Sequence, residues 1–159
     1  MKLIYCCYGG AHSSPVAAAI HLGWLPETER PSPEQILALP RFDRVSSDEF
    51  GVPEQMGVDE DGHEVYVMGR GDRPEVVERA VLSGVRLAGS DPSQVVFVST
   101  LECVNLAMRI GGFLSRTAGL PRWGRPIVLW GTCRAYADLV KLVQKTKRFL
   151  RQAREVERI

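Results

Sequence analysis

The sequence predicts a three-layer α/β domain: a mainly parallel sheet of four strands, helices on both of its faces, and an inserted β-hairpin. Short apolar runs rich in β-branched and aromatic residues alternate along the chain with longer segments of helical periodicity. That alternation is typical of parallel strands joined by crossover helices. Each apolar run is followed by Gly, Ser or Thr, which marks the end of a strand. We expect residues 1–159 to form one domain, because a chain of this length encloses a single core.

Four runs are predicted as strands, in this order: Lys2–Cys7, Glu64–Met68, Gln94–Ser99 and Pro126–Trp130. The segment Gln55–Met68 contains the turn signal Asp59-Glu60-Asp61-Gly62 between two extended stretches. Aspartate and glycine favour tight turns, so this segment is expected to form the hairpin.

Helical periodicity and helix-start signals predict five helices: Ser14–Leu22, Pro33–Leu39, Pro74–Ala88, Glu102–Ala118 and a last helix from Arg134 onward. Gly111 and Gly112 lie within the fourth of these, where each glycine costs ~1 kcal/mol. Close packing of this helix against the sheet or another subunit is the expected reason, and a kink is the alternative. Packing against another subunit would make the protein a homodimer.

The composition is that of an ordinary soluble protein, with 45% hydrophobic residues, 25% charged residues and a net charge of +1. No apolar run approaches the ~20 residues that span a bilayer, and no signal-peptide pattern opens the chain, so we expect no membrane partner. The four cysteines lack the spacing of zinc ligands. We therefore expect free thiols in a reducing cytoplasm, with no metal and no cofactor.

Basic residues are concentrated at the C-terminal end. Lys141–Ile159 has seven Lys or Arg against two Glu, and the pattern becomes strongly charged from about Lys147. The segment matches no recognised nucleic-acid-binding module. An exposed helix end is therefore expected here, and a nucleic acid partner is not.

The most informative segment follows the first strand. Cys7–Ser14 carries Gly9 and Gly10, then paired serines, and an alanine-rich helix comes next. Glycines let a backbone approach a ligand closely, and a helix N-terminus offers unpaired N–H groups and a partial positive charge. Ser13 or Ser14 is expected to cap the helix. This order predicts an anion-binding loop, in which the Cys7 thiol could be reactive.

Ligands of open parallel sheets bind beyond the carboxyl ends of the strands. The predicted strands bring four segments to that edge: Cys7–Ser14, Gly69–Arg73, Thr100–Asn105 and Gly131–Arg134. All four carry Gly, hydroxyl groups, Arg or Cys, so one shared crevice is expected. The candidate ligand-binding residues are Gly9, Gly10, Ala11, Ser13, Ser14, Arg70, Arg73, Thr100, Asn105 and Thr132. The candidate catalytic residues are Cys7 as nucleophile and His12 as acid–base group.

The first loop resembles the phosphate loop of the low-molecular-weight protein tyrosine phosphatases, whose motif is C-x-G-N-x-x-R-S-P. The positions that match in register are Cys7, Gly9, Ser14 and Pro15. The resemblance implies that Cys7 is the nucleophile and that Ser14 stabilises its thiolate. Ser13 stands in place of the motif's Arg, and a serine cannot hold phosphate bidentately. Arg70 or Arg73 is a candidate to replace that Arg.

A wider resemblance covers most of the chain. The phrases Tyr8–Ser14, Val67–Gly71, Met108–Arg116 and Gly124–Thr132 are similar to an uncharacterised bacterial family, domain-of-unknown-function family 3189. The resemblance implies a small cytoplasmic protein with no established activity.

The function predicted from the sequence is the binding of a phosphate-bearing or other anionic small molecule at Cys7–Ser14. Two alternatives stay open. The first is a phosphatase-like or thiol enzyme that depends on Cys7. The second is a non-catalytic protein-interaction module that uses the Gly111-Gly112 helix and the basic end, and whose behaviour would not depend on anions.

Overall fold

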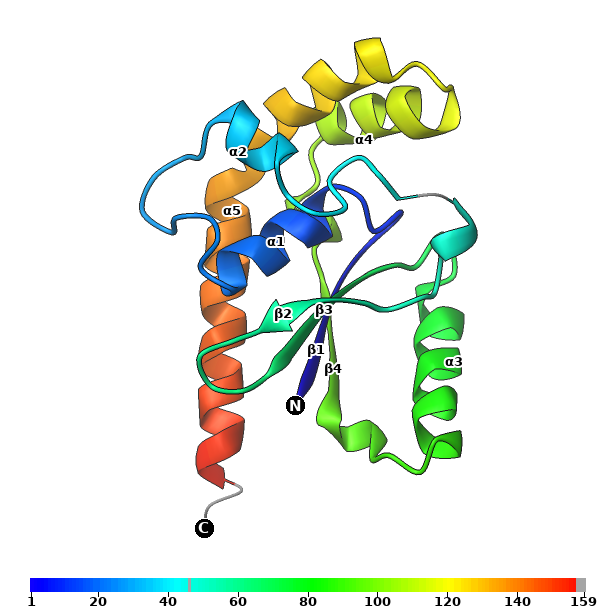
Figure 1. The fold of residues 1–159 in the computed structure, drawn as a ribbon, viewed down its shortest axis with the longest axis vertical. Coiled ribbons are helices and arrows are strands. Elements are labelled where there is room, and N and C mark those ends of the chain that lie inside the picture. Colours follow the sequence, from blue (N-terminus) through cyan, green and yellow to red (C-terminus); the bar gives the residue numbers. More distant parts are fainter. Residues whose placement is uncertain (46, 157–159) are drawn as a thin grey trace.

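The computed structural model describes residues 1–45 and 47–156 and has an α/β fold around a four-stranded sheet (Figure 1). The strands are β1 (Lys2–Cys7), β2 (Glu54–Val58), β3 (Glu64–Gly69) and β4 (Val95–Ser99). They lie in the order β2-β3-β1-β4. β1 is parallel to both β3 and β4, whereas β2 is antiparallel to β3 at the edge, so the sheet is mixed.

Strand β1 lies inside the sheet because both of its faces are apolar. Leu3 and Tyr5 are fully buried in one hydrophobic cluster, whereas Ile4 and Cys6 belong to a second cluster. Successive side chains of a strand point to opposite faces, so the two clusters lie on the two sides of the sheet. A strand buried on both faces forms a continuous apolar run, which explains its clear signal in the sequence.

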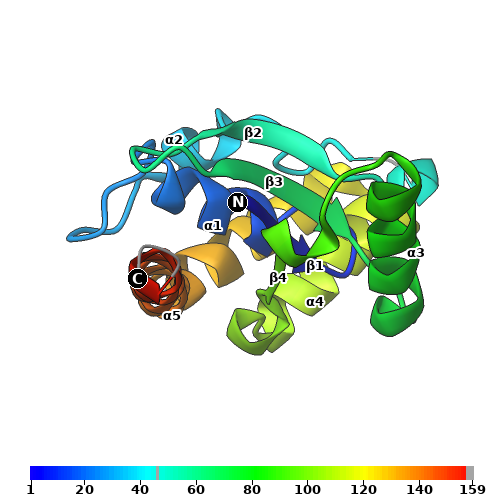
Figure 2. The ribbon, with the colours of Figure 1, turned by 90° about the horizontal axis from the view of Figure 1, so that it is seen from below.

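Helices cover both faces of the sheet. The three longest are α1 (Ser13–His21), α3 (Pro74–Leu87) and α5 (Pro121–Val156). α1 and α5 pack on the face that carries Leu3 and Tyr5. Val77 and Val81 of α3 pack on the other face, and α3 and α5 lie on opposite sides of the strands in Figure 2.

The remaining helical segments are short. They are α2 (Pro33–Leu37), α4 (Leu106–Gly112), the π-helical turn η4 (Phe113–Thr117), and the 3-10 turns η1 (Ser47–Glu49), η2 (Pro92–Gln94) and η3 (Leu101–Cys103). α4, η4 and the first part of α5 form a helical hairpin at the top of Figure 1. Asn105 begins this hairpin, because its side-chain oxygen caps α4 by accepting the N–H of Met108 at 3.0 Å.

Glycines bring α4 and α5 into close contact. A Cβ atom at Gly111 would lie 2.4 Å from the backbone N of Val128, and one at Gly131 would lie 2.8 Å from the backbone N of Met108. Such separations are too short for any side chain, so glycine is required at both positions. Close packing thus accounts for Gly111 as predicted, but the neighbour is α5 of the same chain and not the sheet.

Three expectations about the fold are wrong. The sheet is mixed and not mainly parallel, and the predicted fourth strand, Pro126–Trp130, lies inside α5. Val128 and Leu129 are apolar because they face the core, and Trp130 is an exposed apolar residue beside them, so the run is apolar throughout. A short apolar run does not by itself distinguish a strand from a helix. The helix predicted at Glu102–Ala118 is also divided, into η3, α4 and η4.

The basic end of the chain belongs to α5 as far as Val156 and is paired with acidic residues of the same molecule, whereas residues 157–159 lie outside the described part of the chain. The ion pairs are Lys147–Glu27 at 3.0 Å, Arg151–Glu60 at 3.4 Å and Arg154–Asp61 at 3.0 Å. Two of the three acids lie in the turn between β2 and β3, so this turn and the end of α5 neutralise each other. Within the described residues, no helix is both long enough and apolar enough to cross a membrane.

Candidate functional site

The loop between β1 and α1 (residues 8–12) lies against the end of β3. Gly10 has a φ of +72°, and a Cβ atom there would lie 2.8 Å from the backbone N of Gly69. Any other residue would therefore be strained and would also clash. The backbone N–H of Arg70 donates to the carbonyl of Cys7 at 3.0 Å, which fixes the start of the loop. The loop is thus held beyond the carboxyl ends of β1 and β3, as the sequence predicts.

The thiol of Cys7 lies at the centre of this loop. Its Sγ accepts the backbone N–H of Gly10 at 3.0 Å and lies 3.1 Å from the Oγ of Ser14. The residue is only 5% exposed. Cys6, the preceding residue, faces the opposite side of the sheet, where burial raises its pKa to about 12. Of the two neighbouring thiols, Cys7 alone is therefore surrounded by polar groups of the loop.

Helix α1 begins without a side-chain cap, which corrects the expectation that Ser13 or Ser14 caps it. The Oγ of Ser13 lies 2.7 Å from the Oγ1 of Thr100, and the hydroxyl of Ser14 faces Cys7. The first turn contains no acidic residue. The N-terminus of α1 therefore keeps its partial positive charge, with no carboxylate of its own helix to offset it.

A buried carboxylate ties the loop to the helical hairpin. Asp43 lies with its Oδ1 3.2 Å from the Nε2 of His12. The hydroxyl of Ser115 donates to both carboxylate oxygens, at 2.8 and 2.9 Å, and the Nε of Arg125 donates at 2.8 Å. Burial acts to raise the pKa of Asp43, but the hydrogen bonds from these three side chains outweigh it and hold the pKa well below its usual range.

Of the two candidate arginines, Arg70 is directed away from the loop and Arg73 is exposed. The guanidinium of Arg70 pairs with Glu78 of α3 and donates to the hydroxyl of Ser99 at 2.7 Å. Arg73 is exposed at the start of α3. Among the described contacts, none joins either guanidinium to Cys7. Because Arg70 directly follows β3, its backbone lies beside the loop. Its side chain, however, lies on the side of the sheet that α3 covers.

The remaining candidates fall into two groups. Thr100 lies at the loop, because its hydroxyl contacts Ser13 and donates to the carbonyl of Cys6 at 3.0 Å. Asn105 and Thr132 instead belong to the helical hairpin. The side chain of Asn105 donates to the carbonyl of Gly131 at 2.7 Å, and the hydroxyl of Thr132 is bonded within α5. The expectation that Thr132 lies beside the loop depends on a strand before it, and that segment is helical.

Three residues at the site have no counterpart in the sequence-based prediction. Asp43 and Ser115 hold His12 and the helical hairpin together. The ring of Phe50 contacts that of Tyr8 with centroids 5.9 Å apart, and it would lie 3.8 Å from a Cβ atom at Gly9. Asp43 lies in residues 26–48, which are rich in proline and charge. That composition indicates an irregular segment but does not show against which part of the fold it packs.

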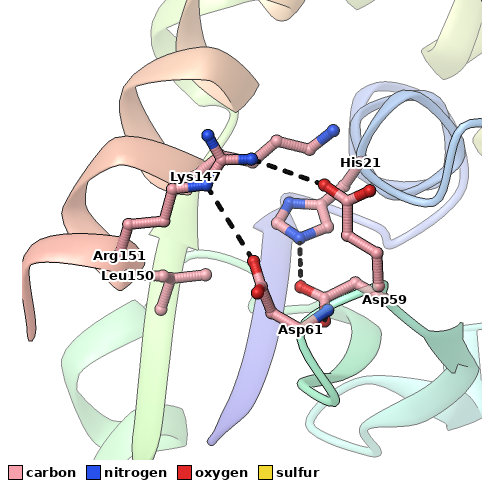
Figure 3. Close-up of a pocket in the computed structure, with 7 residues that line it drawn as sticks. His21, Asp59, Asp61, Lys147, Leu150 and Arg151 are labelled. Carbon is pink, nitrogen blue, oxygen red and sulfur yellow. Dashed lines mark hydrogen bonds and ion pairs between the residues drawn. The ribbon is translucent and has the colours of Figure 1, made fainter. Parts of the chain in front are cut away.

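A second polar cluster lies at the other end of α1, in the cavity of Figure 3. The Nδ1 of His21 lies 2.9 Å from the hydroxyl of Tyr5, and its Nε2 lies 2.9 Å from Asp59. Burial lowers the pKa of His21. The cavity, also lined by Lys147 and Arg151, measures about 10 Å³, which is room for about one water molecule. Among the described residues, no group of His, Cys, Asp and Glu side chains is arranged to hold a metal ion.

The fold and the site define an α/β protein whose central strand leads into a glycine loop with a cysteine at its centre. The chain belongs to the family described as "Protein of unknown function (DUF3189)", whose sequence model matches residues 2–148. No curated protein and no solved structure matches it. The family description gives no activity, and the likeness of the loop to the phosphatases stays a prediction from the sequence. The function is therefore argued from the site.

Proposed function

We propose that the loop between β1 and α1 binds a phosphate-bearing or other anionic small molecule. One observation carries this proposal: α1 begins without a side-chain cap and without an acidic residue in its first turn. Its two serines are bonded elsewhere, Ser13 to Thr100 and Ser14 to Cys7. The first N–H groups of the helix thus lack a side-chain partner and carry the positive end of the helix dipole. A bound anion would accept hydrogen bonds from these N–H groups and would be attracted by the positive end of the dipole.

The backbone of the loop supports the same function. Gly10 turns its N–H toward Cys7, and the hydroxyl of Ser14 faces the same sulfur. Two groups that can donate hydrogen bonds therefore point to one place at the start of α1. Gly9 is half-buried and adds no side chain to the loop, so only the ring of Phe50 would limit a close approach to that backbone.

A reaction that depends on Cys7 is the second candidate function. The hydrogen bond from Gly10 and the contact with Ser14 favour it, because the thiolate form of a cysteine is the nucleophile and such contacts orient it. Phosphoryl transfer in particular has weaker support. Ser13 stands in place of the arginine that would hold the phosphate, and Arg70 is engaged with Glu78.

Thermal stabilisation by anions tests the proposal. We expect inorganic phosphate, sulfate, a nucleotide or a phosphosugar to raise the melting temperature, by about 5–10 °C at a hundredfold excess over Kd. Gly9→Asp should abolish the shift by repelling the anion, and the fold should tolerate it, since a Cβ atom there meets only the ring of Phe50. Gly84→Asp, at an open position in α3, should keep the shift. A flat response across the panel from the folded wild type would refute anion binding at this loop.

Alkylation by iodoacetamide tests the second candidate. Near neutral pH we expect Cys7 to react faster than Cys103 and Cys133, because the N–H of Gly10 and the hydroxyl of Ser14 contact its sulfur and favour the thiolate. Peptide mass spectrometry measures the rate at each cysteine, and Ser14→Ala should slow Cys7 alone. A bound anion should protect Cys7. If Cys7 reacts more slowly than the other two, cysteine chemistry is refuted while anion binding stays intact.

A further inference from the structure

The helical hairpin formed by residues 106–134, which comprise α4, η4, the turn after it and the first part of α5, exposes a group of large apolar side chains. They are Leu106, Ile110, Phe113, Leu120, Trp123 and Trp130, and they are between 46% and 73% exposed. Single exposed apolar residues are normal on a protein surface, but a group on one structural unit marks an interaction site. Anion binding at the loop uses none of these residues, so a role for this surface is independent of the proposed function.

On α4, the apolar residues share one face. Leu106 and Ile110 of α4 and Phe113 at the start of η4 succeed one another at helical spacings of four and three residues, so they form a stripe. The opposite face carries the buried Met108 and Gly111, which contact α5. The stripe therefore points away from the helix on which α4 packs.

The first part of α5 exposes a second group of apolar side chains. Trp123 and Trp130 are seven residues apart, which places them on one side of the helix, and the exposed Leu120 directly precedes it. Val128, between them, is fully buried in the core. The hairpin thus carries apolar side chains both on its core side and on its exposed side. A helix whose outer face contacts only water has polar residues on that face.

The charge of the hairpin indicates what covers this surface. Residues 103–137 contain five arginines and no Asp or Glu. Arg116 and Arg125 reach Asp43, and Arg134 stacks over the ring of Trp130 at 4.9 Å. Arg109 and Arg122 are exposed, and the described contacts give neither an acidic partner. Two copies of this surface would bring like charges together, whereas a partner that is both negatively charged and apolar complements it.

We propose that this hairpin binds the surface of a lipid bilayer that contains anionic lipids. Tryptophan, phenylalanine and leucine side chains insert at the boundary between headgroups and acyl chains, and arginines beside them are attracted to anionic headgroups. A helical hairpin that projects its apolar side chains suits a flat, deformable surface. Binding at a bilayer surface needs no spanning segment. The inference therefore departs from the expectation of no membrane partner, which rests on the lack of such a segment.

Cosedimentation of the full chain with vesicles tests this proposal. We expect about tenfold stronger binding to vesicles of phosphatidylcholine and phosphatidylglycerol, mixed two to one, than to phosphatidylcholine alone. Trp123→Ser and Arg122→Glu should each weaken the binding about tenfold. The matched controls lie on α3: Leu87→Ser, at a residue that is 90% exposed, and Arg86→Glu should leave it unchanged.

Three results would overturn the proposal. The first is the absence of binding to either vesicle while circular dichroism shows a folded protein. The second is equal binding to both vesicles, which would remove the role of the arginines. The third is self-association of the protein that Trp123→Ser abolishes, with no vesicle binding, which would make this surface a contact between protein chains.

Discussion

Gly124→Ala is expected to lower the free energy of unfolding by about 3 kcal/mol, at the upper end of the usual cost of overpacking. A Cβ atom at Gly124 would lie 2.3 Å from the backbone N of Ser115 and 2.6 Å from the carbonyl oxygen of Gly111. Both atoms belong to the backbone, so relief requires α4 and η4 to move away from α5. Alanine favours a helix over glycine by about 1 kcal/mol, which is too little to offset this clash.

Gly84→Ala provides the matched control, because the same change is made within a helix where nothing lies within 4 Å of the new methyl group. This variant should be more stable than the wild type by about 0.5–1 kcal/mol. Urea denaturation measures both variants. Equal effects of the two substitutions would show that the close contact between α4 and α5 does not contribute to stability.

Strand β1, the loop after it and the hairpin formed by β2 and β3 could be predicted because their signals are local. Lys2–Cys7 is apolar on both faces, the glycines of the loop follow at once, and the sequence Asp59–Gly62 specifies a turn by itself. Topology adds one correct long-range placement. Because β1 and β4 are neighbouring parallel strands, Thr100 after β4 comes to lie beside Ser13 after β1.

The error at residues 126–130 has a physical cause that bears on function. A helix with one buried face shows its period of 3.6 residues only if the opposite face is polar. Here Val128 is buried while Trp123 and Trp130 are exposed, so apolar residues occupy both sides of α5 and the period is hidden. The same exposed residues form the surface that we propose binds lipid. The exposed apolar residues of α5 thus account both for the wrong strand prediction and for the surface that we propose binds lipid.

The network around Asp43 could not be predicted from the sequence, because its members are far apart in the chain. Ser115 and Arg125 lie 72 and 82 residues after Asp43, and no local pattern relates them. The prediction of His12 as an acid–base group rests on its place in the loop alone. In the structure this side chain contacts Asp43, which positions it against the helical hairpin.

Asp43→Asn is expected to lower the free energy of unfolding by about 2–4 kcal/mol, since the carboxylate is buried and bonded to several groups. The cost should fall short of the largest values for buried ion pairs, because the side chain of Arg125 is 45% exposed and water screens its charge. The backbone of Asp43 has a φ of +55°, which asparagine adopts as readily as aspartate. The substitution therefore removes the charge without straining the chain.

The pH dependence of the free energy of unfolding tests whether the charge of Asp43, and not only its shape, stabilises the protein. Since the folded state holds the pKa of Asp43 below its ordinary value of 3.8, the carboxylate stabilises the protein above that pH. Its contribution should be lost as the pH falls below about 4, and urea denaturation of Asp43→Asn should show a smaller loss over that range. Asp138→Asn, which removes an exposed carboxylate, should change stability by no more than about 0.5 kcal/mol at any pH. If the two variants behave alike, Asp43 does not hold the loop to the hairpin, and the positioning of His12 must have another cause.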